Sequence, residues 1–273
     1  MEQIIYKKIR KDPVSAWSYL TDAWQSRNLV LIFARRDLKV QYAQTYLGIT
    51  WSVLQPLTAL IVFSFFFQHV VTLNLHVPYV AFVFTGIMGW FYFTSLVGNA
   101  GTALLNNQQI IKKLHFPYIV LPLSRAVVGL VELGISLVIL SAILLFTGGS
   151  ISFRILYLPL VIIANMFTGL SIGLWLSALT IRFRDLHHII PFIIGFGIWI
   201  TPVFYPRTMV PKAYSWIYYF HPIANVISLY RWIFLELPVN WPQVFTSFIV
   251  VIFIFISGLF FFIRNEKFVA EHL

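Results

Sequence analysis

The sequence contains no cysteine and only nine acidic residues, and these shortages exclude several kinds of protein. Without cysteine, the chain has no disulfide framework, no thiol nucleophile and no thiolate metal site. A Gly-Lys dipeptide is also absent, so the phosphate-binding loop Gly-x-x-x-x-Gly-Lys-Ser/Thr cannot form. The chain therefore does not hydrolyse ATP by that loop, and an ATP-driven process would need a separate subunit to supply the energy.

The sequence also lacks the patterns that carry enzyme chemistry. It has no histidine pair around a glutamate at helical spacing, no nucleophile elbow and no aspartate-rich metal motif. The adjacent His187 and His188 point about 100° apart on a helix, so they do not converge on a metal. No catalytic or metal-binding residue is predicted, and a membrane-embedded glycan or lipid transferase is a weak alternative.

Apolar residues dominate what is present. They make up 59% of the chain, charged residues make up 10%, and the mean hydropathy is +0.84. A soluble domain of this length has too little interior to cover so much apolar surface, so the surrounding medium must be lipid. We predict an all-α membrane protein with an N-terminal amphipathic interface helix, six transmembrane helices, and re-entrant outer helices between spans five and six. The spans are expected at 48–71, 79–98, 119–146, 155–179, 189–204 and 244–263.

The basic residues indicate which span ends face the cytoplasm. The formal net charge is +10, and most lysines and arginines lie before the first span, between spans two and three, between four and five, or after six. Cytoplasmic loops carry such an excess, so we expect both termini in the cytoplasm and no nucleic-acid partner. Residues 1–28 contain no apolar core of signal-peptide length, so the first span is expected to be retained.

The order of the apolar spans and basic segments divides the chain into three regions. We expect a cytoplasmic N-terminal region at 1–47, a transmembrane domain at 48–264 and a cytoplasmic tail at 265–273.

Ahead of the first span, Trp17, Leu20 and Trp24 recur at helical spacing. This pattern predicts one or two interfacial helices along the inner leaflet. A disordered basic tail that only enforces topology is the alternative.

The segment at about 205–243 is rich in proline and aromatic residues. Two stretches, 215–220 and 223–235, are long enough for short helices but too short to cross a membrane. Backbone that re-enters a membrane must be helical or buried in protein, and two short helices folding back into the outer half of the bilayer satisfy this condition. An aromatic belt at the headgroup level explains the same composition without a function.

Glu132 lies in the middle of a predicted span, and Arg125 lies seven positions before it on the same helical face. A charge inside a bilayer is costly and usually faces a partner or a water-filled path. These intramembrane charges are either a pore-facing or dimer-interface pair, or a structural tie to a neighbouring helix. One carboxylate does not make a proton relay, and no internal repeat of the kind found in secondary transporters is visible.

The loop between spans two and three, residues 106–117 (NNQQIIKKLHFP), is polar and then basic. Asn106 or Asn107 can cap a short helix there, and Pro117 stops it. An amphipathic helix of two or three turns at this place is a docking site for a partner. An ordinary charged turn that fixes topology is the alternative.

Three patterns resemble the permease subunits of type-2 ABC exporters of polysaccharides and polyol-phosphate polymers. They are residues 35–42 (RRDLKVQY) with 46–56 (YLGITWSVLQP), residues 110–122 (IIKKLHFPYIVLP), and residues 182–185 (RFRD) with the outer segment 202–222. Together with six spans, they cover nearly the whole chain in the order that the family shows. The first pattern is the most specific of the three.

The resemblance implies a permease subunit of the bacterial inner membrane and not an enzyme. Such a subunit forms a homodimer and binds two nucleotide-binding ATPase subunits, which carry ATP and Mg, while the permease holds no cofactor. Family members export undecaprenyl-linked O-antigen, capsule or teichoic acid chains, and O-antigen is favoured here. An exporter of drugs or small lipids is a further alternative.

The resemblance implies roles for two groups of residues, and basic charge near the inner surface indicates a role for a third. The loop resembles a coupling helix that contacts the ATPase through Asn107, Ile110, Ile111, Lys112, Lys113, Leu114 and His115. The interface helix is expected to contact the lipid pyrophosphate, or else anionic headgroups, through Arg35, Arg36 and Lys39. The outer segment resembles a gate, with Tyr214, Trp216, Tyr219, Tyr230 and Trp232 as its expected residues.

A sugar polymer needs a path lined by groups that bind weakly and repeatedly. Aromatic faces allow a chain to slide, whereas dense charge would trap it. Aromatic residues recur at helical spacing on two predicted spans, and these stripes are the candidates for the translocation path. They are Phe63, Phe66 and Phe67 on the first span and Phe192, Phe196 and Trp199 on the fifth. Lipid-facing or packing aromatics are the alternative.

Overall fold

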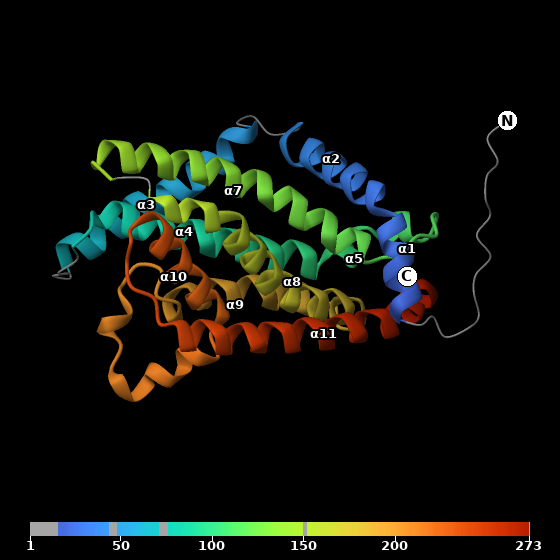
Figure 1. The fold of residues 1–273 in the computed structure, drawn as a ribbon. Coiled ribbons are helices and arrows are strands. Elements are labelled where there is room, and N and C mark those ends of the chain that lie inside the picture. Colours follow the sequence, from blue (N-terminus) through green and yellow to red (C-terminus); the bar gives the residue numbers. More distant parts are fainter. Residues whose placement is uncertain (1–15, 44–47, 71–75, 150–151, 273) are drawn as a thin grey trace.

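The computed structural model describes residues 16–43, 48–70, 76–149 and 152–272, and every regular element within these ranges is a helix (Figure 1). The predicted all-α class is therefore confirmed. Five helical stretches of the described chain are long and apolar enough to cross a membrane: Gly48–Phe66, Tyr79–Ala100, Val120–Phe146, Phe153–Arg182 and Trp241–Glu266. A shorter apolar helix, α9 (Leu186–Ile200), occupies the position of the expected fifth span. That α9 also crosses the membrane stays a prediction.

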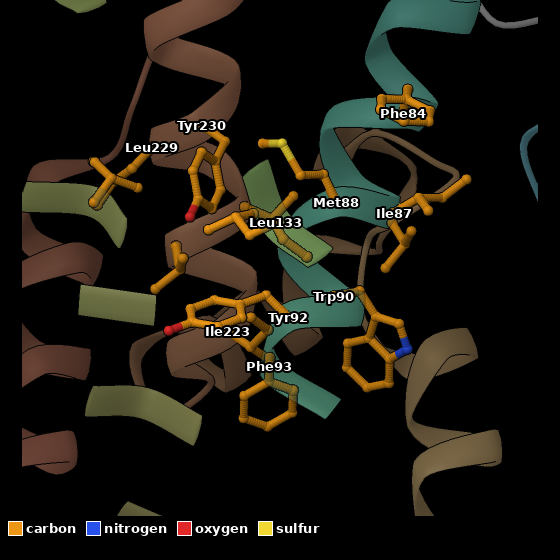
Figure 2. Close-up of a cluster of buried hydrophobic side chains, with 14 of the residues drawn as sticks. Phe84, Ile87, Met88, Trp90, Tyr92, Phe93, Leu133, Ile223, Leu229 and Tyr230 are labelled. Carbon is orange, nitrogen blue, oxygen red and sulfur yellow. The ribbon is translucent and has the colours of Figure 1, made fainter. Parts of the chain in front are cut away.

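The long helices form a bundle around α4 (Tyr79–Ser95). Most α4 residues are buried, because α4 packs against helices on several sides. Its neighbours are α3 (Trp51–Val70), α7 (Val120–Phe146), α8 (Leu158–Arg182) and α10 (Pro222–Phe234). Figure 2 shows Met88 and Trp90 of α4 packed with Leu133 of α7 and Tyr230 of α10 in one apolar core.

Prolines set several helix boundaries. Helix α9 ends at Ile200 because Thr201 precedes Pro202, and a residue before proline is driven out of the helical region into the extended one. Helix α10 begins with Pro222 at its first position, where no backbone N–H is needed. His221 caps α10, since its side chain accepts a hydrogen bond from the Ala224 backbone N–H.

Helix α10 is a short helix inside the protein. Its buried face meets α4 at Gly86 and Gly89, where a side chain would collide with the neighbouring segment. A Cβ atom on Gly89 would lie 3.2 Å from side-chain atoms of Ile227 and Tyr230. Before α10 the chain forms two 3₁₀ turns, η4 (Arg207–Met209) and η5 (Lys212–Tyr219).

Two helices precede the bundle, and they differ in orientation (Figure 1). Helix α1 (Ala16–Gln25) lies across one end of the bundle, next to the C-terminal end of α11 (Trp241–His272). We call this end the α1 end. Helix α2 (Arg27–Ala43) runs beside α7. The orange chain segment before α10 lies toward the opposite end of the bundle (Figure 1).

The segment expected as a coupling helix is shorter than predicted. Residues 106–117 contain α6 (Gln108–Ile111), which is about one turn long, and the last residue of the equally short α5 (Ala103–Asn106). Asn107 stands at the cap position of α6 but does not cap it. Its amide donates to the Ala103 carbonyl at 2.8 Å, and its Oδ1 accepts from Arg36 at 2.7 Å. Because the nitrogen and the oxygen of this amide are both hydrogen-bonded elsewhere, the side chain does not cap α6.

Candidate functional site

A cavity of about 640 Å³ opens between α3, α4, α7 and α9, with the C-terminal end of α2 at its edge. Its polar lining comes from five different elements, so only the folded chain brings these groups together. The polar side chains include Gln41, Ser52, Gln55, Ser95, Asn99 and Glu132.

Among the described residues that line this cavity, Glu132 is the charged one. Its Oε1 accepts a hydrogen bond from the Gln41 amide of α2 at 2.8 Å. Its Oε2 accepts from the Ser95 hydroxyl of α4 at 3.4 Å, and Asn99 donates to that hydroxyl at 3.1 Å. The carboxylate thus joins α2, α4 and α7 at the cavity wall.

A π-helical turn, η2 (Leu96–Ala100), positions part of this wall. Such turns inside helices occur frequently at functional sites. Helix α8 packs very closely on the turn through two glycines. Cβ atoms on Gly169 and Gly173 would lie 2.6 Å from Leu96 Cβ and 3.1 Å from Ala100 Cβ. Because Leu96 and Ala100 are held against α8, Gly98 and Asn99 line the cavity on the other side.

Two tryptophans contribute aromatic surface to the cavity. Trp51 begins α3, lines the cavity and is about half-exposed, and Trp90 of α4 also lines it. On α9 the cavity-lining residues are Ile190, Pro191, Ile194, Gly195 and Ile198.

The residues of the predicted aromatic stripes whose side chains are described lie beside this cavity and do not line it. On α9, Phe192 and Phe196 contact each other with ring centroids 4.7 Å apart, and both are exposed in the single chain. Trp199 packs edge-on against Phe63 of α3, which stacks on Phe204. Phe66 is exposed, and the side chain of Phe67 lies outside the described residues. Their role in a translocation path stays a prediction.

An ionic network joins α2 to α7 and to the predicted coupling segment. Arg36 donates to Asp37 Oδ1 at 2.6 Å and to Asn107 Oδ1 at 2.7 Å. Arg125 Nε of α7 lies 3.2 Å from Asp37 Oδ2, an ion-pair contact without hydrogen-bond alignment. Arg125 and Glu132 therefore both face α2, but they contact different residues of it and do not pair with each other.

The α1 end is held together by a second set of contacts at the start of α7. Glu266 of α11 accepts a hydrogen bond from the Tyr118 backbone N–H at 2.7 Å. The Tyr19 hydroxyl of α1 accepts one from the Ile119 N–H at 3.2 Å. These contacts satisfy N–H groups that a helix start otherwise leaves unpaired. Helices α1, α7 and α11 are thereby joined next to the predicted coupling segment.

The predicted coupling residues divide into an inner and an outer group. Asn107 and Ile111 are buried, and Ile110 is half-buried. The exposed group is Lys112, Lys113, Leu114 and His115. Leu114 is 56% exposed. The segment therefore presents one apolar side chain and two basic ones outward.

The three basic residues predicted to contact lipid also differ in their surroundings. Arg35 and Lys39 are exposed on α2, whereas Arg36 is half-buried in the Asp37 network. On α1, Trp17 and Trp24 are exposed, consistent with one apolar face of an amphipathic helix. A lipid-pyrophosphate contact stays a prediction for all three basic residues.

The residues predicted to form an outer gate lie at different depths. Tyr214 and Trp216 of η5 are exposed, and Tyr219 is half-buried. Tyr230 is completely buried in the core, where the Asn165 amide donates to its hydroxyl at 3.5 Å (Figure 2). Trp232 packs between Tyr157 and Trp241. Their role as a gate stays a prediction.

Two arginines fasten the outer segment to the bundle. Arg231 of α10 is buried and donates to the carbonyls of Pro202 and Val203 at 2.8 and 2.6 Å. Arg207 donates to Asn225 at 2.8 Å and to Gln243 at 3.1 Å. Burial lowers the pKa of Arg231 to about 9 and that of Arg207 to about 10. Both values lie above neutral pH, so both side chains are charged there.

The described residues contain no cluster of three or more histidine, aspartate or glutamate side chains able to hold a metal ion. What the site offers chemically is a polar, aromatic-walled cavity with one carboxylate. Sequence reasoning singled out Glu132 and missed its partners Gln41, Ser95 and Asn99. Ser95 and Asn99 are polar residues four positions apart in an apolar span, and that spacing is a signal that could have found them.

The family model and the relatives found by comparison with known proteins are all described as transport or export proteins. A family model described as ABC-2 type transporter matches residues 28–235. The chain is 29% identical over 248 residues to the O-antigen export system permease protein RfbA of Klebsiella pneumoniae, covering 90% of this chain and 95% of the relative. The RfbA protein of Myxococcus xanthus is 27% identical, with 90% and 96% covered. The polysialic acid transport protein KpsM of Escherichia coli is 21% identical, with 72% and 77% covered.

Proposed function

The chain belongs to the ABC-2 type transporter family, and from that membership we propose that it is the permease subunit of an ATP-driven polysaccharide exporter. The substrate we propose is lipid-linked O-antigen, moved across the bacterial inner membrane. The observation that carries this proposal is the match to O-antigen export permeases over nearly the full length of both chains. A match of that extent includes the helices, the loops and the outer segment together.

The chemistry of the cavity supports a sugar substrate. Ligand sites are commonly cavities of roughly 300–1,000 Å³ that combine apolar and aromatic walls with a few polar groups. The cavity here has a volume of about 640 Å³, tryptophan walls and hydroxyl, amide and carboxylate groups. Such a lining can hydrogen-bond sugar hydroxyls without the dense positive charge that would hold a polymer in place.

We propose that two ATPase subunits, carrying ATP and Mg, drive a homodimer of this chain. The exposed residues Lys112 to His115 would contact the ATPase. Movement of that segment would reach α2 through the hydrogen bond between Asn107 and Arg36 of α2. Helix α1 and the C-terminal end of α11 lie at the same end of the bundle, which supports two cytoplasmic termini (Figure 1). The undecaprenyl-linked polymer would then move outward stepwise along the permease.

A capsule exporter is the second candidate, supported by the match to the polysialic acid transport protein KpsM. That match has lower identity and covers less of both chains than the matches to the O-antigen permeases. Teichoic acid export within the same family remains a further alternative. Export of drugs or small lipids is less favoured, because none of the relatives named above is a drug or lipid transporter.

Deleting the gene from its host tests the proposal directly. We expect the mutant to lose long-chain surface O-antigen on silver-stained gels and to accumulate lipid-linked polymer inside the cell. A plasmid copy of the wild-type chain should restore both, and drug tolerance should not change. Unchanged surface polysaccharide would contradict the proposed function, and loss of another polymer would identify the capsule or teichoic acid alternative.

Purification in mild detergent tests the partner. We expect an ATPase with a phosphate-binding loop to be recovered in equal amounts with this chain, which mass spectrometry would identify. Recovery of the chain with a biosynthetic enzyme, or alone, would contradict the energy-coupling part of the proposal.

A further inference from the structure

We propose that Glu132, Gln41, Ser95 and Asn99 form a glycan-binding subsite that selects uncharged sugar units over anionic ones. This inference rests on the proposed function and adds to it the charge class of the substrate. The comparisons do not distinguish charge, since polysialic acid, named for one relative, carries a carboxylate on every unit, whereas the name O-antigen specifies no charge.

The hydrogen-bonding capacity of the site fits sugar hydroxyls. A carboxylate has about four acceptor positions on its two oxygens. Gln41 occupies a position on Oε1 at 2.8 Å, and Ser95 approaches Oε2 at a longer 3.4 Å. Positions therefore remain for hydroxyl donors from the cavity. The Asn99 amide carries a carbonyl oxygen and a second N–H, which supply a further acceptor and donor.

The aromatic surface lies in the same cavity. Trp51 is about half-exposed and lines the cavity together with Trp90 and Glu132. A sugar ring has an apolar C–H face and polar hydroxyl edges. A large, rigid aromatic ring offers the apolar contact, and the carboxylate and amide groups meet the hydroxyl edges. The arrangement therefore recognises a sugar ring and not a wholly apolar molecule.

The charge of the cavity gives the selectivity. Among the described residues that line the cavity there is no lysine, arginine or histidine, and Glu132 is the acidic one. The nearest arginine on the same face of α7, Arg125, contacts Asp37 instead. An anionic sugar entering this cavity meets a carboxylate without a cation among the described lining residues to offset the repulsion, and like charges at short range repel each other. An uncharged sugar meets no such electrostatic repulsion.

Binding of two matched oligosaccharides to the full chain, with its ATPase partner and reconstituted in lipid nanodiscs, tests the subsite. The probes are a neutral oligoglucose and an oligogalacturonate of the same length, each labelled at the reducing end for fluorescence anisotropy. We expect the wild type to bind the neutral probe about tenfold more tightly than the anionic one.

Three variants separate the subsite from a structural role. Glu132→Ala should weaken binding of the neutral probe about tenfold, because a hydrogen bond to a charged group is lost. Glu132→Gln should remove most of the discrimination by strengthening binding of the anionic probe. Glu236→Gln removes an exposed carboxylate outside the cavity, and we expect it to leave both affinities unchanged. A merely structural Glu132 would alter both probes equally.

Equal binding of both probes by the wild type would overturn the proposal. So would unchanged affinities in both Glu132 variants, or no binding of either probe. The failure of the proposed function looks different, because the deletion strain would then keep its surface polysaccharide whatever the plasmid carries. If the wild type restores surface polysaccharide and both Glu132 variants restore it equally, with unchanged binding, only the subsite fails.

Discussion

Asp37 of α2 lies 3.2 Å from Arg125 of α7, and the same carboxylate receives Arg36 at 2.6 Å. The side chain of Asp37 is only 4% exposed, so its charge is compensated almost entirely by these two guanidinium groups. Through Arg36 the carboxylate is also connected to Asn107, in the segment predicted to contact the ATPase. One acidic residue therefore joins three separate elements of the chain.

Replacing Asp37 by Asn should destabilise the protein by about 3 kcal/mol, because Arg125 is left in a largely buried place without its counter-charge. Thermal unfolding in detergent, compared with the wild type, measures the loss. The double variant Asp37→Asn, Arg125→Gln should lose less than the sum of the two single variants, as expected for residues in contact. Additive losses would contradict the pairing.

Replacing Leu114 by Asp should uncouple ATP hydrolysis from export while the chain still folds, because Leu114 is exposed and the change leaves the core intact. This prediction rests on the proposed function. The ATPase rate of the purified complex and the surface O-antigen of the complemented strain are measured together. Adding Ile110→Asp should deepen the effect, and Leu114→Ala serves as the uncharged control. Normal export by the double Asp variant would exclude this segment as the coupling element.

Replacing Gly86 by Ala should destabilise the fold by about 1–3 kcal/mol through overpacking. The new Cβ would lie 2.6 Å from the Val203 carbonyl oxygen and 2.9 Å from Arg231 Nη2, in the contact that fastens the end of α9. Gly134→Ala is the matched control on α7, since nothing lies within 4 Å of its Cβ. That variant should keep or slightly raise the unfolding temperature, because alanine favours a helix over glycine. Equal effects at the two positions would contradict the packing described for Gly86.

The stability of the protein should fall as the pH drops below about 6.5 through His221. Burial lowers the pKa of His221 below its ordinary value of 6.5, and the charge of Arg207 acts in the same direction. Below pH 6.5 the unfolded chain binds a proton that the folded chain does not, so stability rises with pH up to that value and then levels off. Unfolding temperatures between pH 5 and 8 measure this slope.

The variant His221→Asn tests the assignment of that pH dependence. Asparagine is a good helix cap and does not titrate, so the α10 cap should persist while the slope between pH 5 and 6.5 becomes shallower. His221→Ala should instead lower stability at every pH by about 1 kcal/mol, through loss of the cap. An unchanged slope in the asparagine variant would assign the pH dependence to another group.

The sequence predicts the helices well because their determinants are local. Apolar runs mark the long helices, and prolines such as Pro202 and Pro222 mark where α9 ends and α10 begins. The direction in which a side chain faces is not local. The spacing of Phe192, Phe196 and Trp199 identifies one stripe of α9, but only packing reveals that the neighbouring stripe, with Pro191 and Ile194, lines the cavity.

The contacts between side chains of the site also cannot be predicted from the local sequence. Gln41 and Glu132 are 91 positions apart, and Arg36 and Asn107 are 71 apart. The aromatic character of Tyr230 suits a surface belt as well as a core, and it is the approach of α10 to Gly89 that buries it. Predictions at these places needed the tertiary fold, whereas predictions of helix type and order did not.

The two arginines of the outer segment, of which Arg231 is buried and Arg207 is half-buried, have a consequence for the electrostatic potential at this end of the bundle. The hydrogen-bond partners named for Arg207 and Arg231 are neutral amide and carbonyl oxygens, and the two guanidinium groups lie over the rings of Tyr218 and Phe82. Within the described part of the chain, no ion pair neutralises either charge. Two positive charges held in fixed positions make the local potential positive, which disfavours cations and favours anions nearby. The same side chains that fasten the outer segment thus also set the sign of the electrostatic potential around it.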